Sequence, residues 1–173
     1  GLLCAVVCIM AVAYAAFSTT LNINGTATIS SNWNVAITGI ECEATAVEGG
    51  EAAAVTKSFT GTTATFNFTF NQPGDTGQCR VTIANTGTLD AVASNISIVT
   101  KDGSTAATGL TDGPIQYQVS GINQNDKLVA ESGTATYTID AEFVDNLGGA
   151  APTDDQKTKT LTVTIDYTQD LTA

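Results

Sequence analysis

The chain has 173 residues and a net charge of −11 at pH 7, and only 13% of its positions are charged. The acidic balance argues against nucleic acid and against anionic membrane surfaces as partners. The sequence contains no histidine, so it lacks the commonest general base and the commonest metal ligand. Thr, Ser, Asn and Gly take the place of charged residues, and such a composition is typical of extracellular fibres and adhesion domains.

Residues 1–17 contain no charge, no proline and no amide, and all their side chains are apolar or small. As a helix they would extend about 25 Å, slightly less than the apolar core of a bilayer. Because the pattern is apolar on every side, such a helix cannot lie on a domain with one face in water. We expect it to enter lipid, to be removed, or to be buried among copies of itself. Its large side chains are Leu2, Leu3, Val6, Val7, Ile9, Met10, Val12 and Phe17.

Two kinds of processing fit this segment, and both remain open. In one, a leader ending before Gly1 is removed and the apolar helix stays in the mature protein. In the other, residues 1–15 end a signal peptide, with Ala13-Tyr14-Ala15 as its cleavage site. The start of the sequence at Gly1 favours retention, whereas the local pattern fits cleavage.

After residue 18 the apolar residues recur with a period of two, which predicts strands separated by turns. Strands are predicted over residues 21–24, 26–29, 33–40, 62–70, 79–83, 93–100, 114–119, 134–143 and 159–167. Loops or turns are predicted over residues 44–57, 71–75, 85–87, 101–113, 123–126 and 145–157. Trp33, the single tryptophan, is expected to anchor the core.

This succession of strands predicts a mainly β protein. The expected fold is an N-terminal hydrophobic α-helix over residues 1–17, followed by an antiparallel β-sandwich of Ig-like or jelly-roll class over residues 18–173. No repeat or low-complexity linker divides the second part.

The four cysteines form two different pairs. Cys4 and Cys8 are four residues apart on one helix, where a disulfide does not close without distortion, so we expect them to pack as small apolar residues, with an intersubunit bridge or lipidation as the alternative. Cys42 and Cys79 lie on predicted strands, and in an exported protein we expect them to form a disulfide.

Two other sets of polar residues are candidates for chemistry. Asn24, Asn67 and Asn95 match the N-glycosylation pattern, so glycans are a possible attachment. The carboxylates Asp140, Glu142, Asp145, Asp154 and Asp155 are interpreted as solvated charges, with calcium binding in the 145–157 loop as the alternative. Ser and Thr nucleophiles have no base beside them, and we expect no catalytic residue, cofactor, metal or small-molecule substrate.

Three motifs together resemble a known family. Ala13-Tyr-Ala-Ala-Phe-Ser-Thr, Gln72-Pro-Gly-Asp75 and Asn85-Thr-Gly-Thr-Leu-Asp-Ala91 are similar in kind and spacing to motifs of the TasA/camelysin family, whose members are exported biofilm-fibre proteins. Camelysin relatives are described as metalloproteases, but a chain without histidine cannot contain the H-E-x-x-H motif.

The resemblance implies a fibre in which an extended segment of one subunit completes a sheet of the next. Residues 18–30 would be that donor strand, with Leu21, Ile23 and Ile29 as its apolar anchors. The presence of the leader-like segment departs from the family and looks like the retained helix of a type IV pilin. The chain departs from pilins too, because its helix is short and has no early glutamate.

We therefore expect a pilin-like structural subunit of an extracellular cell-surface filament, used for adhesion or biofilm. Its partners would be copies of itself, with membrane contact during biogenesis. Two alternatives remain: a donor-strand fibre subunit after removal of residues 1–15, and a membrane-anchored surface domain for adhesion or binding.

Overall fold

The computed structural model describes residues 31–101, 103–106, 108–144 and 147–171. The chain divides into two compact units, Gly1–Ser30 and Ser31–Ala173, and only the second is described. The predicted apolar helix and the predicted strands over residues 21–24 and 26–29 therefore lie outside the described residues.

Two antiparallel sheets make up the described unit. Sheet A contains, in spatial order, β1 (Val35–Thr45), β4 (Thr76–Asn85), β10 (Gly133–Phe143), β8 (Ile115–Ser120) and β7 (Gly109–Asp112). Sheet B contains, in spatial order, β2 (Ala54–Thr60), β3 (Thr63–Thr69), β11 (Thr158–Gln169), β5 (Ala91–Thr100) and β6 (Thr105–Ala106), and β9 (Lys127–Leu128) pairs with β5. One short helix, α2 (Asp154–Lys157), precedes β11.

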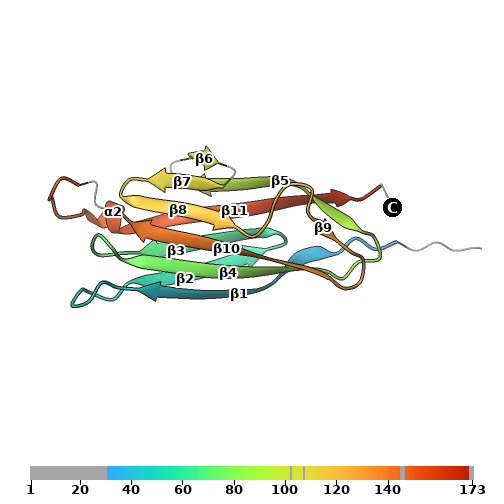
Figure 1. Ribbon diagram of the computed structural model, residues 1–173, viewed down its shortest axis with the longest axis horizontal. Coiled ribbons are helices and arrows are strands. Elements are labelled where there is room, and N and C mark those ends of the chain that lie inside the picture. The colour runs from blue at the N-terminus through green and yellow to red at the C-terminus, as the bar shows by residue number, and fades with distance from the viewer. Residues whose placement is uncertain (1–30, 102, 107, 145–146, 172–173) are drawn as a thin grey trace, which may run out of the picture. The chain divides into compact units, whose positions relative to one another are not determined.

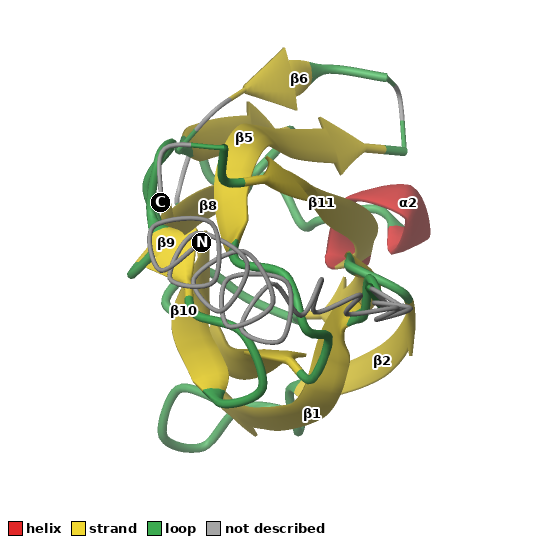
Figure 2. Ribbon diagram, turned by 90° about the vertical axis from the view of Figure 1, so that its right-hand side faces the viewer, coloured by secondary structure: helices red, strands yellow, loops and turns green. Residues whose placement is uncertain are grey.

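The two sheets lie one over the other and curl around a shared interior, as the two perpendicular views show (Figures 1 and 2). The chain crosses repeatedly between them: β1 is in sheet A, β2 and β3 are in sheet B, β4 returns to sheet A, and β5 lies in sheet B. This arrangement confirms the prediction of a mainly β, sandwich-like fold.

Alternation along the strands builds the core. Phe66 and Phe68 of β3 and Phe70, just beyond it, are fully buried, whereas the residues between them face outward. Their rings contact one another, and the Phe68 ring lies 5.8 Å from the ring of Tyr117 on β8. Because β3 and β8 belong to different sheets, this aromatic contact joins the two layers.

Most strands lie where the alternation predicts them, but several short elements occupy predicted loops. β2 begins inside the predicted loop 44–57, β6 and β7 lie inside 101–113, and α2 lies inside 145–157. β9 was not predicted at all. These elements are short or lie at sheet edges. Few of their residues are buried, so their sequences do not show the alternation that predicts a strand.

The prediction that Trp33 anchors the core is wrong. Its side chain is 43% exposed, and it precedes β1, outside the packed layers. Ile37, which is 5% exposed, is the first residue of β1 to enter the core.

The predicted disulfide is present. Cys42 of β1 and Cys79 of β4 are directly opposite in the antiparallel register, and their Cα atoms are 4.1 Å apart. The bond ties the edge strand of sheet A to its neighbour across 37 residues of sequence.

Replacing Cys42 by Ser should lower the free energy of unfolding by up to about 4 kcal/mol, because the unfolded chain regains the entropy of a long loop. Thermal or denaturant unfolding of the protein measures this loss. Reduced wild-type protein is the matched control and should unfold at nearly the same midpoint as the variant. An unchanged midpoint would show that the disulfide does not contribute to stability.

Three tyrosine phenols resist ionisation in the folded state. Burial raises the pKa of Tyr117 and of Tyr137, with smaller contributions from Asp112 and from Tyr167 respectively. Burial, and to a lesser degree the charge of Asp126, raises the pKa of Tyr167 to about 12. The three phenol oxygens are buried without a hydrogen-bond partner among the described residues.

We expect the free energy of unfolding to fall as the pH rises above about 10. The unfolded chain releases these protons near the ordinary tyrosine pKa, whereas the folded chain keeps them. Each phenol contributes at most about 1.4 kcal/mol per pH unit, and the partly solvated Tyr167 contributes less. Denaturant unfolding across alkaline pH measures the slope, which Tyr137→Phe should reduce. Stability that stays constant through this range would contradict the expectation.

Candidate functional site

All of the predicted assembly residues lie outside the described residues. These are Leu2, Leu3, Val6, Val7, Ile9, Met10, Val12 and Phe17 of the apolar segment, and Leu21, Ile23 and Ile29 of the donor segment. The predicted glycosylation site Asn24 also lies outside the described residues. The structure does describe the place where the chain enters the sandwich, and we call this place the junction. It comprises residues 32–34, 85–90, 127–131 and 169–171.

At the junction the first described residues extend the ladder of β1 and β4. The Thr88 amide donates to the Asn32 carbonyl at 2.9 Å, and the Thr86 amide donates to the Asn34 carbonyl at 2.9 Å. The Asn32 amide also donates to the Thr88 hydroxyl at 2.9 Å, and the Asn34 side chain donates to the Thr86 hydroxyl at 2.6 Å. The start of the sandwich is therefore fixed by hydrogen bonds to the loop that follows β4.

Gly87 makes this close approach possible. A Cβ at this position would lie 2.4 Å from the Asn32 carbonyl oxygen and 2.7 Å from the Asn34 nitrogen. Both atoms belong to the backbone, so no side-chain movement would relieve the clash. The glycine of the Asn85-Thr-Gly-Thr motif thus has a structural reason in this chain.

Buried polar groups shape the rest of the loop. The Asn85 side chain, 1% exposed, donates to the carbonyls of Leu89 (2.8 Å) and Leu128 (3.0 Å) and accepts from the Gly87 amide. Asp90 accepts from the Ala130 amide through its carboxylate at 2.6 Å and from the Asp170 amide through its carbonyl at 2.9 Å. Loop 85–90 therefore holds the entering chain, the segment around β9 and the end of β11 together.

Large apolar side chains remain exposed around the junction. Trp33 is 43% exposed, Val129 is 55% exposed and Leu171 is 82% exposed. Each lies next to a residue that bonds to loop 85–90, and an open pocket of about 400 Å³ is lined by residues 88–90 and 169–171. Among the described residues, three of the five exposed large apolar side chains thus border residues that bond to loop 85–90, whereas Val47 and Phe59 are exposed elsewhere.

The opposite end of β4 carries the second motif. Asp75 is fully buried, and its carboxylate accepts from the amides of Val47 (2.9 Å), Asn71 (2.8 Å) and Gln72 (3.2 Å). Gly74 has a φ of +92°, which suits glycine in this turn. The Gln72-Pro-Gly-Asp75 turn is thus a folding element organised around one carboxylate.

The outward face of sheet B is a lattice of hydroxyls and amides. Threonines pair across β3 and β11 at 3.0 Å (Thr63 and Thr164) and 3.3 Å (Thr65 and Thr162). Asn67 lies in the same lattice, accepting from Thr160 at 2.7 Å, and Asn95 is exposed and donates to Asp166 at 3.1 Å. Two of the predicted glycosylation asparagines therefore lie on this face.

The outward face of sheet A is acidic instead. It holds a shallow groove of about 470 Å³, and Asp140, on the floor of that groove, accepts from the Gln78 side chain at 2.6 Å. Its charged and amide lining comprises Glu43, Gln78, Gln116, Gln118, Asp140 and Glu142. Asp140 and Glu142 lie on the same face of β10.

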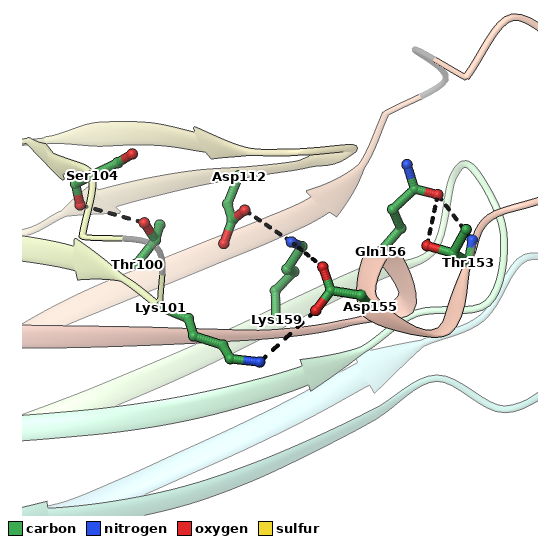
Figure 3. A network of polar contacts seen from close by, with 8 residues as sticks. All are labelled: Thr100, Lys101, Ser104, Asp112, Thr153, Asp155, Gln156 and Lys159. Atoms are coloured by element: carbon green, nitrogen blue, oxygen red, sulfur yellow. Dashed lines mark hydrogen bonds and ion pairs between the residues drawn. The ribbon is translucent and has the colours of Figure 1, made fainter.

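Asp154 and Asp155 lie in the first turn of α2, and Asp145 is outside the described residues. Asp155 pairs with Lys101 at 3.8 Å and with Lys159 at 3.6 Å (Figure 3). Within the described ranges, no group of three or more Cys, Asp or Glu side chains is arranged to hold a metal ion. No helix in the same part of the chain is long and apolar enough to cross a membrane.

Comparison of the chain with protein-family models, curated proteins and solved structures found no match. The resemblance to the TasA/camelysin family therefore stays a prediction from three motifs, two of which the structure describes as turns at the two ends of β4.

Replacing Gly87 by Ala should separate residues 32–34 from loop 85–90, because the added methyl group overlaps two backbone atoms. Hydrogen exchange at the Thr86 and Thr88 amides should quicken by about tenfold, the loss expected for one net hydrogen bond. Gly39→Ala is the matched control, since a Cβ there meets no atom within 4 Å. Unchanged protection at both amides in Gly87→Ala would show that the junction does not depend on this glycine.

Proposed function

We propose that this protein is the structural subunit of an extracellular cell-surface filament, and that its copies are joined through the N-terminal segment. The observation that carries the proposal is the junction. An uncharged apolar segment precedes the sandwich, and the first described residues of the sandwich are fixed by hydrogen bonds to loop 85–90. A force applied to the N-terminal segment would therefore be transmitted directly to the hydrogen-bonded strands of sheet A.

The composition supports the same function. Burying an apolar helix of 17 residues removes on the order of 1,500 Å² from water, a large driving force for association. The apolar side chains exposed around the junction offer a contact surface for a neighbouring subunit. We propose that the N-terminal residues form the helix in the filament core and that the sandwich, of Ig-like or jelly-roll class, faces outward.

An export route fits the covalent structure. Disulfides persist in oxidising compartments, and the Cys42–Cys79 bond lies on an edge strand that benefits from a covalent tie. The outward faces, one rich in hydroxyls and one acidic, would meet the surroundings of the filament in adhesion or biofilm.

The other way to join copies is donation of a strand by residues 18–30 after removal of residues 1–15. Both routes give a filament, and they differ in which residues lie between subunits. A membrane-anchored surface domain would keep the apolar segment in lipid and would form no filament.

Replacing Val7 by Asp should abolish filaments if the helix lies in the core, because each copy would bury a charge at a cost of about 3 kcal/mol or more. Negative-stain microscopy of the cell surface and of exported protein measures the loss. Val7→Leu, which keeps the segment apolar, and Ala151→Asp, which adds the same charge at an exposed loop, should both assemble normally.

Normal filaments from Val7→Asp would contradict the helix-core route. In that case Ile23→Asp separates the remaining alternatives: lost filaments would support donor-strand joining, and intact filaments would overturn assembly through the N-terminal segment altogether. The amount of exported protein must be measured for each variant, so that a defect in export is not taken for a defect in assembly.

A further inference from the structure

Lys159 and Asp112 face each other between the two sheets, beside an open pocket that they line together with Lys101 and Asp155. Lys159 is directly opposite Phe68 in the register of β11 and β3, so its side chain shares the inward face of sheet B. Asp112 is opposite Ile115 in the register of β7 and β8, and its side chain is 5% exposed. The Lys159 Nζ and Asp112 Oδ1 atoms are 3.0 Å apart, and the lysine side chain is 13% exposed.

The pair has an apolar setting on its inner side and the open, charged pocket on its outer side. Phe68 and Ile115, its strand neighbours, are fully buried, and the Phe68 ring contacts Tyr117. Gly113, the residue after Asp112, lies against the lysine stem: a Cβ there would be 3.6 Å from Lys159 Cε. Two charges placed in such a setting lose hydration that a single ion pair replaces only in part.

The second oxygen of Asp112 shows that the ion pair does not fully replace the hydration that the carboxylate has lost. Asp112 Oδ2 is buried and has no hydrogen-bond partner among the described residues. A buried carboxylate oxygen without a partner is costly, and its occurrence calls for an explanation.

A second carboxylate reaches the same amine. Asp155 Oδ2 lies 3.6 Å from Lys159 Nζ, and the Asp155 side chain is 76% exposed (Figure 3). Burial acts to lower the pKa of Lys159, but Asp112 and Asp155 together raise it. Both carboxylates thus favour the ammonium form of Lys159, so a proton must leave the nitrogen before it can act as a nucleophile, and Asp155 is the solvated group nearest to receive that proton.

We propose that Lys159 and Asp112 condense to form an intramolecular isopeptide bond that joins β11 of sheet B to β7 of sheet A. The ammonium group first gives a proton to Asp155, and the free amine attacks Cγ of Asp112. The new bond is between Nζ and Cγ, and a carboxylate oxygen leaves as water with the two protons that the nitrogen loses. Ammonium and carboxylate thus become a neutral amide and one water, and no other reactant is needed.

Proximity and burial favour this step. Groups held in contact react as if present at very high concentration, which offsets the unfavourable equilibrium of amide formation in water. The product also removes both buried charges and the unpartnered carboxylate oxygen. Because the disulfide lies within sheet A, the amide would be the covalent link between the layers. The inference does not depend on the filament proposal.

The test is the intact mass of the full chain after reduction of the disulfide. We expect a loss of about 18 Da, the mass of one water, relative to the sequence. Lys159→Arg keeps the positive charge but lacks the amine, and should have the full mass. Lys101→Arg, a change at the other lysine bound to Asp155, is the matched control and should still lose water.

A succinimide at Asp112-Gly113 would also remove one water, so the variants must separate the two products. A succinimide would still form in Lys159→Arg and would be cleaved by hydroxylamine. The isopeptide bond would be absent from Lys159→Arg and would resist hydroxylamine. Asp112→Asn should fold like the wild type and lose about 17 Da, because ammonia replaces water as the leaving group. Fragmentation of a protease digest should show the peptides of Lys159 and Asp112 linked.

Asp155→Ala should slow the reaction and leave part of the protein at full mass. A mass loss as complete as in the wild type would overturn the role of Asp155 as proton relay. The full sequence mass in the folded wild-type protein, or a loss of water that survives Lys159→Arg, would overturn the bond itself.

Discussion

The packing of β3 against β8 brings the two sheets together, and the rest of the sandwich depends on that packing. Phe66, Phe68 and Phe70 form one buried row, and Phe68 meets Tyr117 across the interior. With the inward positions occupied in this way, the period of two places polar residues on the outward faces. The threonine lattice of sheet B and the acidic groove of sheet A are therefore consequences of one core.

Buried polar groups fix the turns and the strand register that the apolar core alone does not determine. Asp75 organises the turn before β4, and Asn85 with Gly87 organises the loop after it. Near the end of the sandwich that carries α2, Lys159 and Asp112 place an ion pair between the layers. Such groups are stabilising only when their partners are correctly placed, so they fix the register of the strands more than they add to burial.

The sequence was sufficient for the strands that span the core, because burial on one face imposes a strict alternation on their residues. It was insufficient for β6, β7 and β9, which are short, and for β2, whose edge position leaves most of its residues exposed. Trp33 was misplaced because size and apolarity do not reveal that a residue lies beyond the end of a strand. The disulfide was predictable from two cysteines on strands. The junction was not predictable, because nothing in the sequence around Asn32 and Asn34 indicates that these residues bond to loop 85–90. The unusual position of Lys159 was visible in the sequence. It occupies a place in β11 where the alternation predicts an inward-facing apolar residue.

The central claim is that copies of this chain are joined through their N-terminal segments, with the junction carrying the connection into sheet A. Electron cryomicroscopy of filaments assembled by the full chain tests that claim most directly. The account predicts a repeating sandwich and density for the N-terminal segment that continues from the junction and makes the contacts that join neighbouring subunits. Filaments whose contacts are made entirely between sandwiches, or a protein that stays monomeric on the cell surface, would contradict it.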